Sequence, residues 1–188
     1  SMFQLGKTML LSLVSGFGTA AIAANAVGNT LATFMVLPGM ALGFAVITVI
    51  SRCIGAGDYE QARYFTKKLL KITYLSMLVT NILVVVAMPV IVKLYNLSEV
   101  ASTIAMQIIL SHGIAAILIW PLAFTLPNTL RAANDVKFSM VISILSMWIW
   151  RVGFSYILGI YFHMGVLGVW VAMLSDWLCR SICFGLRF

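Results

Sequence analysis

Few side chains in this sequence could do chemistry, and four of them are charged or titratable groups inside long apolar stretches. Arg151, Asp176, His112 and Lys7 all have mainly hydrophobic neighbours in the sequence. Such groups are costly in apolar surroundings, so they pair with one another or lie on a path for ions, protons or substrate. We therefore take these four residues as candidates for an ion or substrate pathway.

Each of them also has a structural interpretation. Arg180 follows Asp176 by one helical turn, so an i,i+4 ion pair is the simplest role for Asp176, and pairing with Arg151 is the alternative. His112 is either a packed, hydrogen-bonded group or a proton-coupling group, because imidazole titrates near neutral pH. Arg151 lies roughly 21 Å along a helix from Lys137 at 1.5 Å per residue, and it either has a structural partner or lines a cavity.

Amide side chains form a second set of candidates. Gln107, Asn81, Asn25 and Asn29 lie within apolar segments, where amides usually bond across helices. Asn25 and Asn29 are one turn apart on a single helix face, so together they could line a cavity. Lys7 either faces the interior or anchors in lipid headgroups, depending on where its helix begins.

The composition determines the kind of element that must hold these residues. The chain of 188 residues is 62% hydrophobic and 9% charged, whereas soluble domains carry roughly 25% charged residues. We expect an all-α membrane protein in contact with membrane lipid. The net charge of +7 does not indicate a nucleic-acid partner, because the basic residues cluster at the ends of segments. The sequence has no nucleophile–base pair, phosphate loop or metal cluster, so it does not indicate an enzyme, a metal site or an organic cofactor.

Six apolar segments predict a bundle of six transmembrane helices with short connections. The first is shorter than the roughly 20 residues of a full span, so we expect the chain to begin partway through a helix. Pro38 and Pro121 are predicted bend points and candidate hinges. Residues 55–63 and 127–137 are predicted to be polar hairpins at one end of the bundle. The segments cover about residues 2–17, 20–54, 66–92, 100–124, 138–160 and 166–184.

The basic residues predict the orientation in the membrane. With six antiparallel spans, nine basic residues share one face and Lys93 lies on the other. The positive-inside rule then places the nine-charge face, and both ends of the chain, on the cytoplasmic side of the plasma (inner) membrane. The nine residues are Arg52, Arg63, Lys67, Lys68, Lys71, Arg131, Lys137, Arg180 and Arg187.

Several motifs, in this order and spacing, resemble the multidrug and toxic compound extrusion (MATE) family. The runs Ala-Ala-Ile-Ala-Ala-Asn-Ala at 20–26, Leu-Pro-Gly-Met-Ala-Leu-Gly at 37–43 and Ile-Gly-Ala-Gly-Asp at 54–58 are similar to one helix region and the loop after it. Residues 127–137 resemble a loop that lies further along the family's sequence. Trp148, Arg151 and residues 165–173 resemble its last two helices. The resemblance covers essentially the whole chain, as the C-terminal half of a MATE protein.

This resemblance implies a twelve-helix antiporter built from two six-helix lobes, of which residues 1–188 would be the C-terminal lobe. It implies export of cationic, amphipathic, drug-like compounds by alternating access, in exchange for sodium ions or protons. The absent N-terminal lobe would be a partner in forming the cavity. One departure concerns coupling: many bacterial relatives use acids in this lobe's first and fourth helices, whereas the fourth segment here offers only His112.

Two alternatives stay open at the level of sequence. A lipid-linked oligosaccharide flippase of the same superfamily would need a strongly cationic central cavity, which only Arg151 and Lys7 could provide. A membrane scaffold without transport activity would not need bent helices and buried charge.

Overall fold

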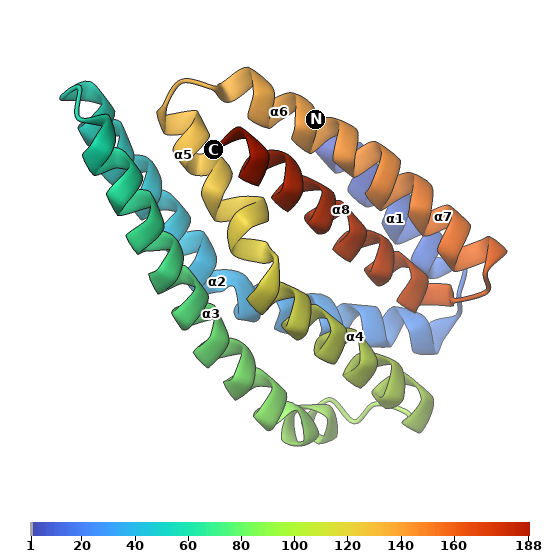
Figure 1. Cartoon of the computed structure of the whole chain (residues 1–188). Helices are drawn as coiled ribbons and strands as arrows, with labels where there is room; N and C mark the ends of the chain where they lie inside the picture. The colour runs from blue at the N-terminus through green and yellow to red at the C-terminus, as the bar shows by residue number, and fades with distance from the viewer. Residues whose placement is uncertain (1) are drawn as a thin grey trace.

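The computed structural model describes residues 2–188, and the described chain folds into helices without strands (Figure 1). In chain order, these are α1 (Met2–Ser15), α2 (Thr19–Gly55), α3 (Tyr59–Leu94), α4 (Glu99–Leu118), η1 (Pro121–Thr125), α5 (Leu126–Ala132), α6 (Val136–Ser146), η2 (Met147–Gly153), α7 (Phe154–Tyr156), η3 (Ile157–Tyr161) and α8 (Gly165–Arg187). The three η segments are π-helical.

The π-helical segments join shorter helices into continuous rods. α4, η1 and α5 follow one another along one rod, and α6, η2, α7 and η3 along another, so the helices form six rods (Figure 1). Five helical runs are long and apolar enough to cross a membrane, and α1, with 14 residues, is shorter. The expectation of an all-α membrane protein is confirmed.

The two predicted polar hairpins are wrong in extent. α2 and α3 leave only residues 56–58 between them, and α5 continues through Ala132 into the range predicted as a loop. Pro127 does not prevent this helix, because the preceding π-helical segment places it in the first turn of α5, where its missing N–H is tolerated. The Asn128 amide also donates to the Gly43 carbonyl of α2 at 3.1 Å. This bond ties α5 to the neighbouring helix.

The turn between α2 and α3 and the turn between α5 and α6 have the same backbone structure. Gly57 and Asn134 have positive φ angles of 75° and 69°. The N–H of the following aspartate donates back to Cys53 in the first turn and to Leu130 in the second. These are the bonds of a helix C-terminus closed by a left-handed residue. Consequently, each helix stops and reverses within three residues.

α2 changes direction in its middle, and its two halves contact different helices (Figure 1). Pro38, a predicted bend point, lies inside this helix of 37 residues, where it removes one backbone donor. At Gly39, an added Cβ would lie 2.3 Å from Cζ3 of Trp120. The glycine therefore lets the rod containing α4 and η1 approach the bend.

The second predicted bend point, Pro121, lies where the α-helical bonding of α4 stops. The Leu122 N–H donates to the Ile119 carbonyl, three residues back, and not to that of Leu118. The Tyr74 hydroxyl of α3 donates to the Leu118 carbonyl at 3.2 Å instead. A side chain from a neighbouring helix thus satisfies a backbone group at the break, as a membrane interior requires.

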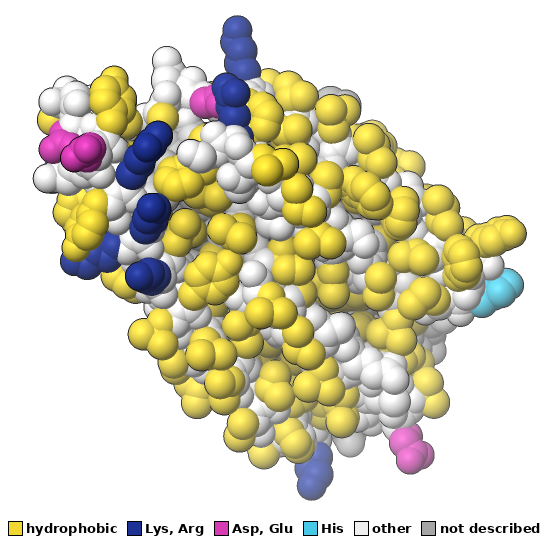
Figure 2. Space-filling view, viewed as in Figure 1, with side chains coloured by type: hydrophobic (Ala, Val, Ile, Leu, Met, Phe, Trp, Pro, Cys, Tyr) yellow, Lys and Arg dark blue, Asp and Glu magenta, His cyan; other side chains and the backbone are white. Residues whose placement is uncertain are grey.

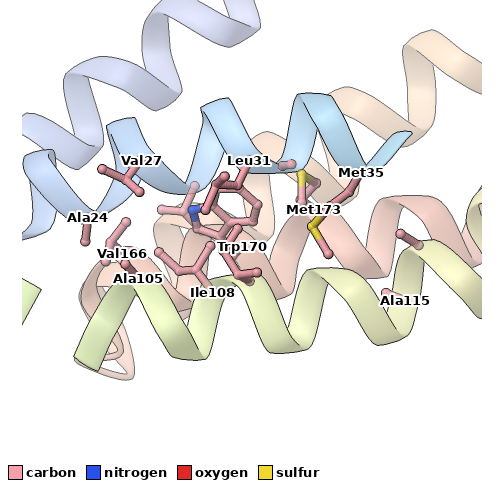
Figure 3. Packing of buried hydrophobic residues seen from close by; sticks show 14 of the residues in the cluster. Ala24, Val27, Leu31, Met35, Ala105, Ile108, Ala115, Val166, Trp170 and Met173 are labelled. Carbon is pink, nitrogen blue, oxygen red and sulfur yellow. The ribbon is translucent and has the colours of Figure 1, made fainter. Parts of the chain in front are cut away.

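The main core lies where α2, α4 and α8 meet (Figure 3). Ala24, Ile108 and Trp170 contribute to it from the three helices. Lys and Arg side chains gather at one end of the molecule in Figure 2, and one more lies at the opposite end. The clustering of basic residues expected from the sequence is therefore present, but Arg180, one of the nine residues assigned to that face, is buried in an ion pair with Asp176.

Candidate ligand cavity

A cavity of about 350 Å³ opens among α1, α2, η2 and α8. Four of the candidate residues line it: Lys7, Asn25, Asn29 and Arg151. The remaining lining is apolar or aromatic and consists of Leu10, Leu11, Val14, Val169, Trp170 and Met173. Apolar walls with a few polar groups are typical of sites that bind small molecules.

Arg151 is positioned by the π-helical segment η2, which spans Met147–Gly153. Its Nε atom is buried and has no hydrogen-bond partner among the described residues. The alternative pairing with Asp176 is not formed, because Arg151 makes no salt bridge within the described chain. Lys7, from α1, is exposed and lines the same cavity. Two cationic side chains from different helical segments thus line one cavity.

The two asparagines of α2 are positioned by their own contacts. Asn25 is buried, and its Oδ1 accepts a hydrogen bond from Trp170 Nε1 of α8 at 3.0 Å. The Asn29 amide donates to the backbone carbonyl of Asn25 at 2.9 Å. Both residues line the same cavity.

Asp176 belongs to a separate, fully buried network. Arg180 Nε donates to its Oδ1 at 2.8 Å, so the predicted i,i+4 ion pair is formed. The Ser146 hydroxyl also donates to Oδ1, and the second guanidinium branch of Arg180 donates to the Ser143 carbonyl at 3.1 Å. Arg180 lies over the Phe124 ring at 5.4 Å. This network joins α6 to α8 and is not among the residues that line the cavity.

The other candidates lie apart from the cavity. His112 is buried between two tryptophan rings, with centroid distances of 5.5 Å to Trp170 and 5.1 Å to Trp177. Its ring nitrogens have no hydrogen-bond partner in the described chain. Asn81 donates to the carbonyls of Met35 and Met77 and so joins α3 to α2.

Gln107 differs from the rest because its side chain is exposed on the outer surface of α4. Two further hollows lie away from the cavity. The larger, of about 470 Å³, is at the basic end near Arg63 and Arg187. The smaller, of about 240 Å³, lies beside Gly39 and Trp120, near the bend of α2.

The fold and the cavity define a class: a helical, multi-pass membrane protein with a polar cavity between its helices. A comparison with protein families gives the particular family. The MatE family model matches residues 1–157, and the chain belongs to this family.

Curated relatives agree with this assignment. A probable multidrug resistance protein, YoeA from Bacillus subtilis, is 28% identical over 89% of this chain and 36% of its own length. A probable multidrug resistance protein, NorM from Halalkalibacterium halodurans, is 27% identical over 93% of this chain and 38% of its own length. The chain therefore spans less than two-fifths of these relatives.

A solved structure supports the fold. A MOP superfamily transporter from Pyrococcus furiosus superposes on 98% of this chain and 40% of its own chain, with a TM-score of 0.88 and 22% sequence identity. At this level of identity the similarity concerns the fold. It agrees with the expected architecture of a six-helix lobe.

Sequence reasoning missed part of the cavity. Trp170 both lines it and holds Asn25, and Met173 follows one turn later on α8. Both lie within the run at 165–173 that supported the resemblance, but apolar residues in an apolar helix give no signal of which way they face. The π-helical segment around Arg151 likewise had no sequence signal.

Proposed function

We propose that this chain forms one lobe of a secondary active exporter of amphipathic, drug-like compounds. The complete protein would hold the substrate between this lobe and a second lobe and would work by alternating access. Sodium ions or protons would drive the exchange. The basic end of the lobe, with both ends of the chain, would face the cytoplasm in the plasma (inner) membrane.

One observation carries this proposal: a chain of the MatE family places in a cavity between helices an arginine whose buried Nε has no partner among the described residues. Unpaired charge is costly in a membrane, and it is found where substrates or ions pass. The relatives YoeA and NorM are named as probable multidrug resistance proteins, which agrees with drug-like substrates.

The test is gradient-driven efflux by the complete reading frame in proteoliposomes. Ethidium, rhodamine 6G and fluorescein would each be loaded, and a sodium gradient and then a proton gradient would be imposed. Efflux of any of them under either gradient supports an antiporter and identifies its ion. Absence of efflux of all three under both gradients, from protein shown to be folded, would refute the proposal.

The arginine of the cavity gives a sharper version of this test. We expect Arg151→Ala to lower export, because the cavity loses a charge that the described chain leaves unpaired. Lys93→Ala, at the far end of α3, serves as the control. Wild-type export by Arg151→Ala would remove this residue from the pathway.

A lipid-linked oligosaccharide flippase is the second candidate. The observation that favours it is the charge of the cavity, since Lys7 and Arg151 both line it. Cationic drugs, the class that the family resemblance predicts, would find no acidic partner among the described lining residues.

A further inference from the structure

We propose that the cavity among α1, α2, η2 and α8 binds an oxyanion: the carboxylate, sulfonate or phosphate of an amphipathic molecule. This inference rests on the proposed function, because it treats the cavity as part of the substrate path. It assigns the site a ligand charge opposite to the cationic drugs expected from the family resemblance.

The charged residues that line the cavity all have the same sign. Lys7 and Arg151 are the only charged members of the lining within the described chain, and both are cationic. Four of the five acids of the sequence lie in turns or at helix ends. The fifth, Asp176, accepts from Ser146 and Arg180 through Oδ1, its Oδ2 has no hydrogen-bond partner among the described residues, and it is not part of the lining. The described lining residues thus include two cations and no acid.

Arg151 has a guanidinium that the described residues do not fully satisfy. Its buried Nε atom lacks a hydrogen-bond partner within the described residues. A guanidinium remains charged under all ordinary conditions, so it cannot reduce the cost of burial by losing a proton. Its planar donors match carboxylate and phosphate oxygens in a two-point contact. An oxyanion would therefore satisfy both the charge and the free donor.

The cavity has the size and the apolar wall of a small-molecule site. A volume of about 350 Å³ is at the lower end of the range for small-molecule sites, which is roughly 300–1,000 Å³. Leu10 and Val14 from α1 and Met173 from α8 provide an apolar surface, and the Trp170 ring is held in place by its bond to Asn25. An apolar body with one anionic group fits this combination, whereas a small inorganic anion would leave the apolar wall unused.

The test compares two probes that share a xanthene core and differ in charge. Fluorescein is anionic and rhodamine 6G is cationic. Binding of each to the complete purified protein would be measured by fluorescence polarisation, and transport of each in proteoliposomes. The variants are Arg151→Gln, Arg151→Lys and Lys7→Gln, with Lys93→Gln as the matched control outside the cavity.

We expect fluorescein to bind more tightly than rhodamine 6G. Arg151→Gln should weaken fluorescein binding about tenfold or more, because a desolvated charge pair loses one partner. Arg151→Lys should lose less than Arg151→Gln, and Lys93→Gln should have no effect. Lys7 is exposed, so Lys7→Gln should fold and weaken fluorescein binding even if Arg151→Gln fails to fold.

The outcomes separate this inference from the proposed function. Transport of rhodamine 6G alone, with fluorescein binding unaffected by Arg151→Gln and Lys7→Gln, would overturn the oxyanion site and leave the exporter intact. If neither probe is transported, fluorescein binding that depends on Arg151 still supports the site, and fluorescein binding independent of both cations overturns it.

A final arm identifies the source of the oxyanion. Binding would be repeated in nanodiscs of phosphatidylcholine alone and with added phosphatidylglycerol. If phosphatidylglycerol competes with fluorescein in wild-type protein but not in Arg151→Gln, the natural oxyanion is a lipid headgroup. If phosphatidylglycerol does not compete, and fluorescein binding still depends on Arg151, the oxyanion belongs to a transported compound and not to a lipid headgroup.

Discussion

Two aspartate–arginine pairs in this lobe have nearly the same geometry and very different surroundings. Arg180 Nε lies 2.8 Å from Asp176 Oδ1, and the side chains are 6% and 0% exposed. Arg187 Nε lies 2.9 Å from Asp135 Oδ2, and the side chains are 56% and 28% exposed. Each arginine also lies over a phenylalanine ring, at 5.4 Å and 5.2 Å. Replacing each aspartate with asparagine therefore compares a buried pair, in which Asp176 also accepts from Ser146, with a pair in contact with solvent.

The two substitutions should differ several-fold in cost. Asp176→Asn leaves the Arg180 guanidinium buried without its counterion, and breaking a buried pair in this way costs about 3–5 kcal/mol. Asp135→Asn breaks a pair in contact with solvent, which costs about 0–1 kcal/mol. The Asp135 side chain makes no capping hydrogen bond at the start of α6, so the second substitution removes no cap.

The assay is reversible unfolding of the complete protein in mixed micelles with an increasing fraction of SDS, followed by circular dichroism. The double variant Asp176→Leu with Arg180→Met removes both charges and should recover most of the lost stability, because no unpaired charge is left. Equal costs for Asp176→Asn and Asp135→Asn, or a double variant no more stable than Asp176→Asn, would refute the reasoning.

Two other close contacts between helices allow matched tests by the same unfolding assay. Tyr74→Phe removes the hydroxyl that donates to the Leu118 carbonyl and should cost about 1 kcal/mol, whereas the exposed Tyr64→Phe should be neutral; equal effects would contradict the role of this bond. Gly39→Ala places a Cβ 2.3 Å from an indole carbon and should cost about 1–3 kcal/mol by overpacking. Gly55→Ala meets nothing within 4 Å, so a loss of stability as large as that of Gly39→Ala would show that backbone preference, and not packing, decides the effect.

The sequence predicted the helical rods well and their ends less well. Apolar runs determine where helices cross a membrane, and all six predicted segments correspond to rods in the structure. The error at residues 127–132 arose because Pro127 and polar neighbours usually indicate a loop. There, a π-helical segment shifts the bonding pattern and Asn128 bonds to Gly43 of α2. Local composition does not show that a neighbouring helix will supply such a bond.

The same difference between local signals and tertiary contacts applies to the candidate residues. Lys7 and Arg151 were candidates because of their charge, and Asn25 and Asn29 because of their one-turn spacing, which are local signals; all four line the cavity. The partner of Asp176 was predicted correctly as Arg180, one turn away on the same helix. The outward direction of Gln107 could not be predicted, because a single polar residue in an apolar helix does not indicate which side faces the bundle.

The contacts of α8 bear on how the lobe is made in the cell. α8 is synthesised after every other helix described here, yet it carries the partners of polar groups on earlier helices. Trp170 bonds to Asn25 of α2, and Asp176 and Arg180 bond to α6. Until α8 enters the membrane, these groups lack these hydrogen-bond partners. A chain interrupted before α8 would therefore leave these polar groups without the partners that the described structure gives them.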